Sequence, residues 1–594
     1  MLMHGVDYQN FDIYKGDTLR EDKYGDVKMT VQVCNPPYSL KYDANPALLD
    51  DPRYSGAGKL PPKSHADYAF VEHMIYHMGD DDGRVAVLLP HGVLFRGGAE
   101  EVIRKYIVRD LNRLDAVIGL APNLFHGTSI PVCLLVLKTK RNGNSGNVLF
   151  IDASKEFKPG KNQNTLEDEH IQKIVDAYVK REDVDRFAHV ADMAEIEANG
   201  WNLNIPRYVD SSEAAEHWDV YASMFGGIPA AELDELSAYW AAFPALRGEL
   251  FAENGTPYAA LTVEDIKSAI KNSRDVTAFE DAYRSAFAAL PAYMKAVLLD
   301  GMDKIEIAKT ETTLSEDIFA RLADIPLIDK YEAYQLLDDH WNTIAVDLEM
   351  IQTEGFGAAK KVDPHLVTKK KGNEEQEVQD GWVGHILPFD LLQKTLLKDK
   401  AGALHALENQ LAELPTEYEA LLDEFTEDDK DAYKECFTEE GDAFVPKEIA
   451  KKVKELRRDR TPEAQNACRI FSRVEELTKQ EKALKAEIKS DAASLEALTK
   501  KTIGGLTDAQ VLELLEQKWI APFTNELAKL PDAMVDSLVN KIQTLQNKYS
   551  TTFFDVESEI RATEKQLAAM MDDLTGSEYD LKGLSEFKTL LLGD

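Results

Sequence analysis

The sequence is poor in cysteine and has no long apolar run. Its 594 residues include only four cysteines, which lie far apart and show no metal-type spacing: Cys34, Cys133, Cys436 and Cys468. They indicate reduced thiols in a cytoplasmic protein, with no disulfide scaffold and no metal site. No run of about 18 apolar residues occurs, which argues against a membrane-spanning helix. The N-terminus has neither a basic nor an apolar leader segment, so it is not a secretory signal.

Positive charge is also scarce. There are 68 Lys and Arg against 105 Asp and Glu, for a net charge of −37. Clustered Lys and Arg bind phosphates by releasing the counterions of DNA. Because this chain is acidic, we expect its overall electrostatic field to bind duplex DNA only weakly. No helix-turn-helix, zinc finger or basic-aromatic stripe is present either. A DNA-directed activity would therefore depend on a basic partner, although the acidity could equally serve only to maintain solubility.

The N-terminal region alternates short apolar runs with helical stretches, up to about residue 155. The pattern predicts strands at 31–35, 84–90, 114–120, 132–138 and 148–154, and helices at 67–78 and 100–110. Strands separated by helices predict an α/β fold with a mainly parallel sheet, in which 31–35 is a buried strand. Ligands of such sheets bind at the carboxyl ends of the strands, where Asn35, Pro90 and Pro122 fall.

Helical periodicity dominates after about residue 160. A polar stretch rich in Lys, Gly and Glu interrupts it at 355–381 and predicts a flexible loop. Apolar residues recur at alternating spacings of three and four within 404–425 and 470–498, and a third such run starts at 538–549. These runs favour long helices packed as a coiled coil or hairpin, with an ordinary helical bundle as an equal alternative.

The strongest chemical signal is Asn35-Pro36-Pro37-Tyr38, directly after the first predicted strand. The amino group of adenine is a poor nucleophile because its lone pair is delocalised into the ring. The Asn35 side-chain oxygen and the Pro36 carbonyl can accept hydrogen bonds from both amino hydrogens, which frees that lone pair for a methyl group. Two prolines, Pro36 and Pro37, stiffen the loop, and Tyr38 offers a stacking face worth about 1–3 kcal/mol per base. The motif therefore predicts catalysis of amino-group methylation by alignment and electrostatics.

This tetrapeptide indicates the reaction better than the substrate. It also serves enzymes that methylate glutamine amides in proteins or amino groups in RNA, and it can occur as a rigid loop with an Asn cap. Cys34 precedes the motif, but the order of cysteine and proline that cytosine-ring methyltransferases use is absent. We interpret Cys34 as a small apolar residue at a strand end, and His91 and His126 as structural.

Several collinear blocks resemble the methyltransferase domain of the modification subunit of type I restriction–modification systems, an N-6 adenine DNA methylase family. They are LMHGVD (2–7), Gly16-Asp17-Thr18-Leu19, HADYAFVEHM (65–74), GRVAVLLPHGVLFRGG (83–98), the block 103–137 and NLNIPRYV (202–209). The resemblance covers Leu2 to Asp210 and, more loosely, YEAYQLLDDHWN (331–342). It implies a partial Rossmann-like domain that uses S-adenosyl-L-methionine, with Asp17 and Asn35 at the cofactor. It also implies that Phe125 is a second aromatic residue, beside Tyr38, against a flipped base. The alternatives are that Asp17 is a turn residue and that Phe125 belongs to the core.

The resemblance also implies a division of the chain and a set of partners. We expect the C-terminal part of the catalytic domain at 1–210, a helical domain at 211–354, a loop and connector at 355–400, and a helical, partly coiled-coil docking region at 401–594. The implied partners are DNA bound through the complex, a specificity subunit that reads the sequence, a second modification subunit and a restriction subunit. Competing hypotheses are an inactive assembly scaffold and a stand-alone adenine methyltransferase.

The family carries a strand and a Gly-rich cofactor turn ahead of the matched blocks. The Gly-rich stretches of this sequence, at 96–98 and 502–505, lie in the wrong order to replace that turn. We therefore expect an N-terminally truncated domain that on its own binds S-adenosylmethionine weakly or not at all.

Overall fold

The computed structural model describes residues 7–126, 128–212, 217–253, 255–302, 304–371 and 374–593. The chain forms two compact units, the first from residues 1–270, 329–335 and 538–594 and the second from 271–328 and 336–537. Of the block LMHGVD, all but Asp7 lies outside the described residues.

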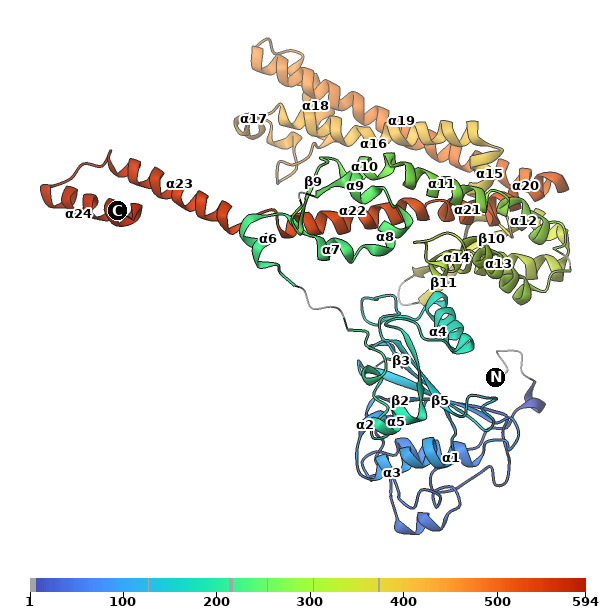
Figure 1. Cartoon of the computed structure of the whole chain (residues 1–594). Helices are drawn as coiled ribbons and strands as arrows, with labels where there is room; N and C mark the ends of the chain where they lie inside the picture. The colour runs from blue at the N-terminus through green and yellow to red at the C-terminus, as the bar shows by residue number, and fades with distance from the viewer. Residues whose placement is uncertain are drawn as a thin grey trace. The chain divides into compact units, whose positions relative to one another are not determined.

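The first unit contains two β-sheets and most of the short helices (Figure 1). Its strands are β1 (Val31–Cys34), β2 (Arg84–Pro90), β3 (Leu114–Leu120), β4 (Val132–Lys138), β5 (Asn147–Ala153), β6 (Ala188–Asp192), β7 (Ile228–Pro229), β8 (Phe251–Glu253) and β9 (Tyr258–Leu261). Its helices are α1 (Asp67–Tyr76), α2 (Gly92–Phe95), α3 (Ala99–Lys105), α4 (Asp168–Lys180), α5 (Met193–Ala198), α6 (Val220–Phe225), α7 (Ala230–Asp234), α8 (Ser237–Ala242), α9 (Leu246–Leu250), α23 (Phe553–Met571) and α24 (Glu578–Leu592).

The second unit is mainly helical. It contains α11 (Arg274–Phe287), α12 (Leu290–Leu298), α13 (Ile307–Leu322), β10 (Val362–Lys371), β11 (Glu374–Gly384), α15 (Phe389–Thr395), α16 (Lys398–Asp423), α17 (Glu427–Ala432), α18 (Pro446–Leu456), α19 (Pro462–Gly504), α20 (Asp508–Trp519) and α21 (Ala521–Leu527). Three of the four unit boundaries fall within α10 (Ile266–Asn272), α14 (Lys330–Glu354) and α22 (Leu530–Lys548), and the fourth lies just before α14. Among the described helices, none combines the length and the apolar character that crossing a bilayer requires.

The large sheet of the first unit is mixed. Its strand order is β1-β2-β4-β3-β5-β6. β1 pairs with β2 and β3 with β5 in parallel, whereas β4 is antiparallel to both β2 and β3, and β6 is antiparallel to β5. The prediction of a mainly parallel sheet was therefore wrong. Neighbouring parallel strands need a crossover of a dozen or more residues, usually helical, and the short link 121–131 between β3 and β4 contains no helix among its described residues, 121–126 and 128–131.

The carboxyl ends of four strands nevertheless share one edge of this sheet. Because β4 is antiparallel to both β2 and β3, the strands β1, β2, β3 and β5 all run in the same direction. Asn35, Pro90 and Pro122, each at or just beyond the end of one of these strands, lie at that edge, as predicted.

The first strand differs from its prediction. β1 was expected to be buried, yet it forms the edge of the described sheet, and Val31 and Val33 are 63% and 81% exposed. A run of apolar residues alone does not distinguish a central strand from an edge strand, since both alternate side chains across the sheet.

Helices cover both faces of the large sheet. α1 and α3 lie on one face and α4 on the other (Figure 1). The core under α1 and α3 includes Val71, Val87 and Phe150. The core under α4 includes Ile118 and Ile151, with the half-buried rings of Tyr38 and Phe125 packed against it. The predicted helix 100–110 is α3 followed by a π-helical turn, Tyr106–Asp110.

Strands that were not predicted from the sequence occur in three regions, namely β6 at the edge of the large sheet and the two regions described next. β10 and β11 form an antiparallel hairpin in which Val367 pairs with Val378, so most of the segment 355–381 is not the flexible loop that its polar composition suggested. β-branched residues at paired positions stabilise such a hairpin despite the surrounding charges. The expected helical domain also begins with a small sheet of order β7-β9-β8.

The first two heptad runs form long helices that pack against each other. α16 and α19 bury a shared cluster of Leu414, Leu477 and Leu484. The Tyr418 hydroxyl donates to Thr478 Oγ1 at 3.2 Å, while Glu424 pairs with Arg469, so the two helices run antiparallel. The prediction of long helices over these runs is confirmed, and α16 continues through Pro415.

Candidate active site

The Asn-Pro-Pro-Tyr motif forms the loop that leaves β1 at the carboxyl edge of the large sheet. Asn35 and Pro37 are exposed, Pro36 is buried and Tyr38 is half-buried. The loop is thus fixed through Pro36 while Asn35 remains accessible to a ligand. Burial of the motif inside the sheet would have contradicted the catalytic prediction, and it is not observed.

Asn35 and Tyr38 contact each other directly. The Tyr38 hydroxyl donates to Asn35 Oδ1 at 2.7 Å. Burial raises the pKa of Tyr38, with the neighbouring Cys133 adding to the effect and the bond to Asn35 opposing it, so the phenol stays protonated and remains a donor. The Tyr38 hydroxyl therefore holds Asn35 Oδ1 in place. This is the oxygen predicted to accept a hydrogen bond from the amino group of the base, so the hydroxyl and the amino group compete for it.

Phe125 lies beside the loop. Its ring meets that of Tyr38 edge to face, with centroids 6.5 Å apart and an interplanar angle of 78°. The Phe125 backbone forms an isolated bridge with Thr128 in the β3–β4 link. The structure thus brings Asn35, Tyr38 and Phe125 together from two distant segments, although Phe125 also serves the core under α4.

A buried carboxylate braces the loop from α1. Ser39 has a φ of 51°, an uncommon conformation for a non-glycine residue, and its N–H donates to Asp67 Oδ1 at 2.8 Å. Asp67, which is fully buried, also pairs with Arg96 at 3.1 Å, and Arg96 pairs with Glu100. This brace was not predicted from the sequence, where its signal was an acidic residue at the first position of a predicted helix.

Asp17 forms a turn of its own. Its Oδ1 accepts a hydrogen bond from the Leu19 N–H at 3.1 Å, and its side chain, 58% exposed, lies 3.5 Å from Arg20. The contacts that the described part of the chain gives Asp17 are local to this turn and do not join it to Asn35. The turn-residue interpretation is therefore satisfied, and the carboxylate remains accessible for a further contact.

The neighbouring polar groups have structural partners. Burial raises the pKa of the Cys34 thiol, which disfavours a nucleophilic thiolate and agrees with a small packing residue at the strand end. His91 Nε2 lies 3.0 Å from the Val132 carbonyl and links the end of β2 to the start of β4. Neither residue contributes an activated group to the loop.

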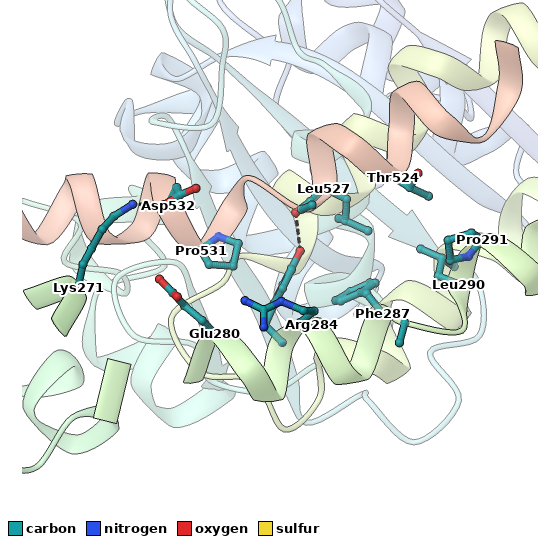
Figure 2. A pocket seen from close by; sticks show the side chains of 13 residues that line it. Lys271, Glu280, Arg284, Phe287, Leu290, Pro291, Thr524, Leu527, Pro531 and Asp532 are labelled. Atoms are coloured by element: carbon teal, nitrogen blue, oxygen red, sulfur yellow. Dashed lines mark hydrogen bonds and ion pairs between the residues drawn. The ribbon is translucent and has the colours of Figure 1, made fainter. Parts of the chain in front are cut away.

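A cavity of about 550 Å³ lies elsewhere, in the second unit. Figure 2 shows it between side chains of α11, among them Arg284 and Phe287, and the segment that contains Leu527 and Pro531. The Tyr283 hydroxyl closes one part of its wall by donating to the Leu527 carbonyl at 2.7 Å. No residue of the Asn35 loop lines this cavity, so it is separate from the candidate active site.

The comparisons with known proteins concern the N-terminal region. Residues 1–217 match the family model for N-6 DNA methylase. The methylase subunit of the type I restriction enzyme MpnII from Mycoplasma pneumoniae is 38% identical over 230 residues, which are 37% of this chain and 42% of that protein. The corresponding MjaVII subunit from Methanocaldococcus jannaschii is 36% identical over 231 residues, which are 37% of this chain and 39% of that protein.

Among solved structures, a type I restriction–modification methyltransferase subunit from Streptococcus thermophilus is 51% identical, with 35% of this chain and 45% of that chain covered and a TM-score of 0.34. The chain thus spans less than half the length of each relative named here. Residues 1–217 thus match the N-6 DNA methylase family model and are similar to part of the type I restriction enzyme methylase subunits.

Proposed function

We propose that this chain transfers a methyl group to the exocyclic amino nitrogen of adenine in duplex DNA, as the modification subunit of a type I restriction–modification complex. The observation that carries the proposal is the grouping of Asn35, Tyr38 and Phe125 at the carboxyl edge of the sheet. An exposed amide oxygen beside two aromatic rings suits a planar base that bears an amino group.

The residues of the loop divide the work. Tyr38 and Phe125 hold the extruded base. The Tyr38 hydroxyl releases its hydrogen bond to Asn35 Oδ1, and this oxygen then accepts a hydrogen bond from one amino hydrogen of the base. The Pro36 carbonyl accepts the other. The two acceptors localise the lone pair on nitrogen, so that catalysis depends on orientation and electrostatics without a covalent intermediate.

Two of the residues present offer contacts that S-adenosylmethionine would use as the methyl donor. The Asp17 carboxylate is exposed and offers an acceptor to an amino or hydroxyl group, and Asn35 is exposed next to the position of the base. When bound, the cofactor supplies an electrophilic methyl group on a sulfonium. Asp17 and Asn35 are the residues that we propose contact it.

Product analysis tests the proposal. The chain, purified with the proteins that accompany it, is incubated with DNA and methyl-radiolabelled S-adenosylmethionine, and the DNA is digested to nucleosides. We expect the label in N6-methyladenine. Recovery of the label in cytosine, in RNA or in protein glutamine would contradict the proposed substrate.

The brace on the loop gives a second test. Replacing Asp67 with Ala leaves the Ser39 N–H and Arg96 without their partner, and we expect a fall of about 10- to 100-fold in kcat with a smaller change in KM, because misplacement of a reacting group by about 1 Å costs about that much. Asp67→Asn retains an oxygen for Ser39 and should recover most of the rate. Equal losses in both variants would indicate that the charge of Asp67 positions the loop, and not its hydrogen bond from Ser39.

The C-terminal helices offer a surface for the partner. In α23, Val556, Ile560, Leu567 and Met570 are 42%, 52%, 42% and 68% exposed. With Thr563 they follow alternating spacings of four and three residues, the seam of a coiled coil, and the exposed Leu574 continues the pattern just beyond the helix. Exposed apolar seams of this length mark protein–protein contacts. We infer that this seam, residues 556–574, docks an amphipathic helix of the specificity subunit.

Charge placed in the seam should abolish that docking. A double variant, Ile560→Asp with Leu567→Asp, is expected to weaken partner binding at least about 100-fold, because two buried apolar contacts are replaced by desolvated charges. Co-purification and isothermal titration with the partner measure the loss. Ala562→Asp, which puts the same group on an exposed position outside the seam, should bind normally. Unchanged binding by the double variant would assign docking to another surface.

A further inference from the structure

A compact group of metal-ligating side chains lies outside the candidate active site, where the N-terminal segment packs on α1. His73 and His77 are one helical turn apart at the end of α1, and Asp22 approaches them from the segment before β1. One ligand atom from each residue lies within 4.8 Å of the others. Both histidines are buried, with exposures of 7% and 1%.

The hydrogen bonds of His77 orient it as a ligand. His77 Nδ1 lies 2.8 Å from the Val27 carbonyl, which can only accept, so Nδ1 carries the proton. His77 Nε2 lies 3.1 Å from Asp22 Oδ2, a distance at which either a proton on Nε2 or a bound cation joins the two atoms. A backbone carbonyl on the other ring nitrogen is the usual arrangement for a metal-bound histidine. The separation is also close to the ~3.3 Å between two ligands of one tetrahedral zinc.

The surroundings of His73 permit ligation. Its Nδ1 lies 3.1 Å from a guanidinium nitrogen of Arg53. The same Arg53 nitrogen donates to the Thr18 carbonyl at 2.8 Å, and Asp51 pairs with the other side of the guanidinium at 2.7 Å. Arg53 therefore still has hydrogen-bond acceptors if His73 rotates to bind a metal. Asp51 offsets the charge of Arg53, which leaves Asp22 to attract a cation.

We propose that Asp22, His73 and His77 bind a divalent transition-metal ion, with Zn²⁺ as the best match to two imidazoles and one carboxylate. Water completes the coordination. The bound ion ties the segment that contains Asp22 and Val27 to α1 and so stabilises the first unit against local unfolding.

Calorimetric titration of ZnCl2 into the chelator-treated full chain tests the proposal. We expect one Zn²⁺ per chain and a higher Tm with the metal. Asp22→Asn removes the charged ligand from a partly exposed segment without changing side-chain volume, so the fold is retained, and we expect an affinity at least about 100-fold lower with no rise in Tm. With Co²⁺ in place of Zn²⁺, the absorption spectrum should lack thiolate charge-transfer bands. This result would distinguish metal bound at this site from metal bound by cysteines.

His189 provides a matched control. It also lies between two carboxylates, 3.1 Å from Asp183 and 3.0 Å from Glu195. Among the described residues, however, no second histidine joins it in a metal-ligating group. His189→Asn should therefore bind one Zn²⁺ like the parent chain. Failure of the parent chain to bind Zn²⁺ stoichiometrically, or equal binding by Asp22→Asn, would overturn the proposal and assign the Asp22–His77 contact to a protonated imidazole.

Discussion

Replacing Asn35 with Ala is expected to lower the rate of methyl transfer by about 100- to 1000-fold, the loss typical of removing one acceptor or donor aimed at developing charge. Asn35 is exposed, so its truncation leaves no cavity and the Tm should change little. Single-turnover transfer of radiolabelled methyl groups by the purified assembly measures the effect. Because the proposed hydrogen bond strengthens as the amine becomes nucleophilic, kcat should fall much more than KM rises.

Two variants of Tyr38 serve as controls for this experiment. Tyr38→Phe removes only the hydroxyl that donates to Asn35 and keeps the ring beside Phe125, so we expect a rate within about tenfold of the parent. Tyr38→Ala also removes the stacking face and should cost about 1–3 kcal/mol of base binding. A normal rate for Asn35→Ala would refute the role of its oxygen and, with it, the proposed chemistry of the loop.

The positions of β1 to β5 in the large sheet could be predicted from the sequence, but the directions of the strands could not. The strands 84–90, 114–120 and 132–138 were predicted with the bounds that the structure has, because each is mainly apolar and has clear ends. Direction depends on which strands pair, and that is set by contacts between distant segments. The shortness of the link 121–131 was a local sign that β4 runs against its neighbours.

The catalytic residues of the candidate site could be predicted from the sequence, but most of the residues that position them could not. Asn35 and Tyr38 lie within one motif, whereas the contact between Tyr38 and Phe125 joins residues that no spacing rule connects, and only the family resemblance suggested it. Asp67 was missed because an aspartate at a helix start normally stabilises the helix itself. The Asp22, His73 and His77 group was missed for a similar reason, since the two histidines suggest a metal only once the carboxylate is known to be near.

A second buried carboxylate holds together the far end of the sheet. Asp115, at the start of β3, is fully buried and lies 3.0 Å from Lys138 and 3.5 Å from both Arg141 and Arg181. The Tyr178 hydroxyl donates to it at 2.7 Å. Burial acts to raise the pKa of Asp115, but the hydrogen bonds from Tyr178 and Lys138 and the charge of Arg181 outweigh it and hold the pKa below its usual value.

Replacing Asp115 with Asn is expected to destabilise the sheet by about 3–5 kcal/mol, because it leaves buried guanidinium groups without their counter-charge. The folded pKa lies below the unfolded one, so the carboxylate contributes its full stability above the unfolded pKa of about 3.9 and loses it as the pH falls through the folded value. The difference between parent and variant should therefore be constant near neutral pH and shrink below about pH 4. Amide hydrogen exchange in β3 and β5, followed from pH 7 downward, measures it.

Tyr178→Phe is the matched control, because it removes one hydrogen bond to Asp115 and leaves every charge in place. We expect it to cost about 1.5–3 kcal/mol, the usual net value of a hydrogen bond to a charged group. If Asp115→Asn costs no more than Tyr178→Phe, the three cations do not depend on the carboxylate, and the order of this end of the sheet comes from apolar packing alone. A clearly larger loss identifies Asp115 as the residue that allows Lys138, Arg141 and Arg181 to converge on the start of β3.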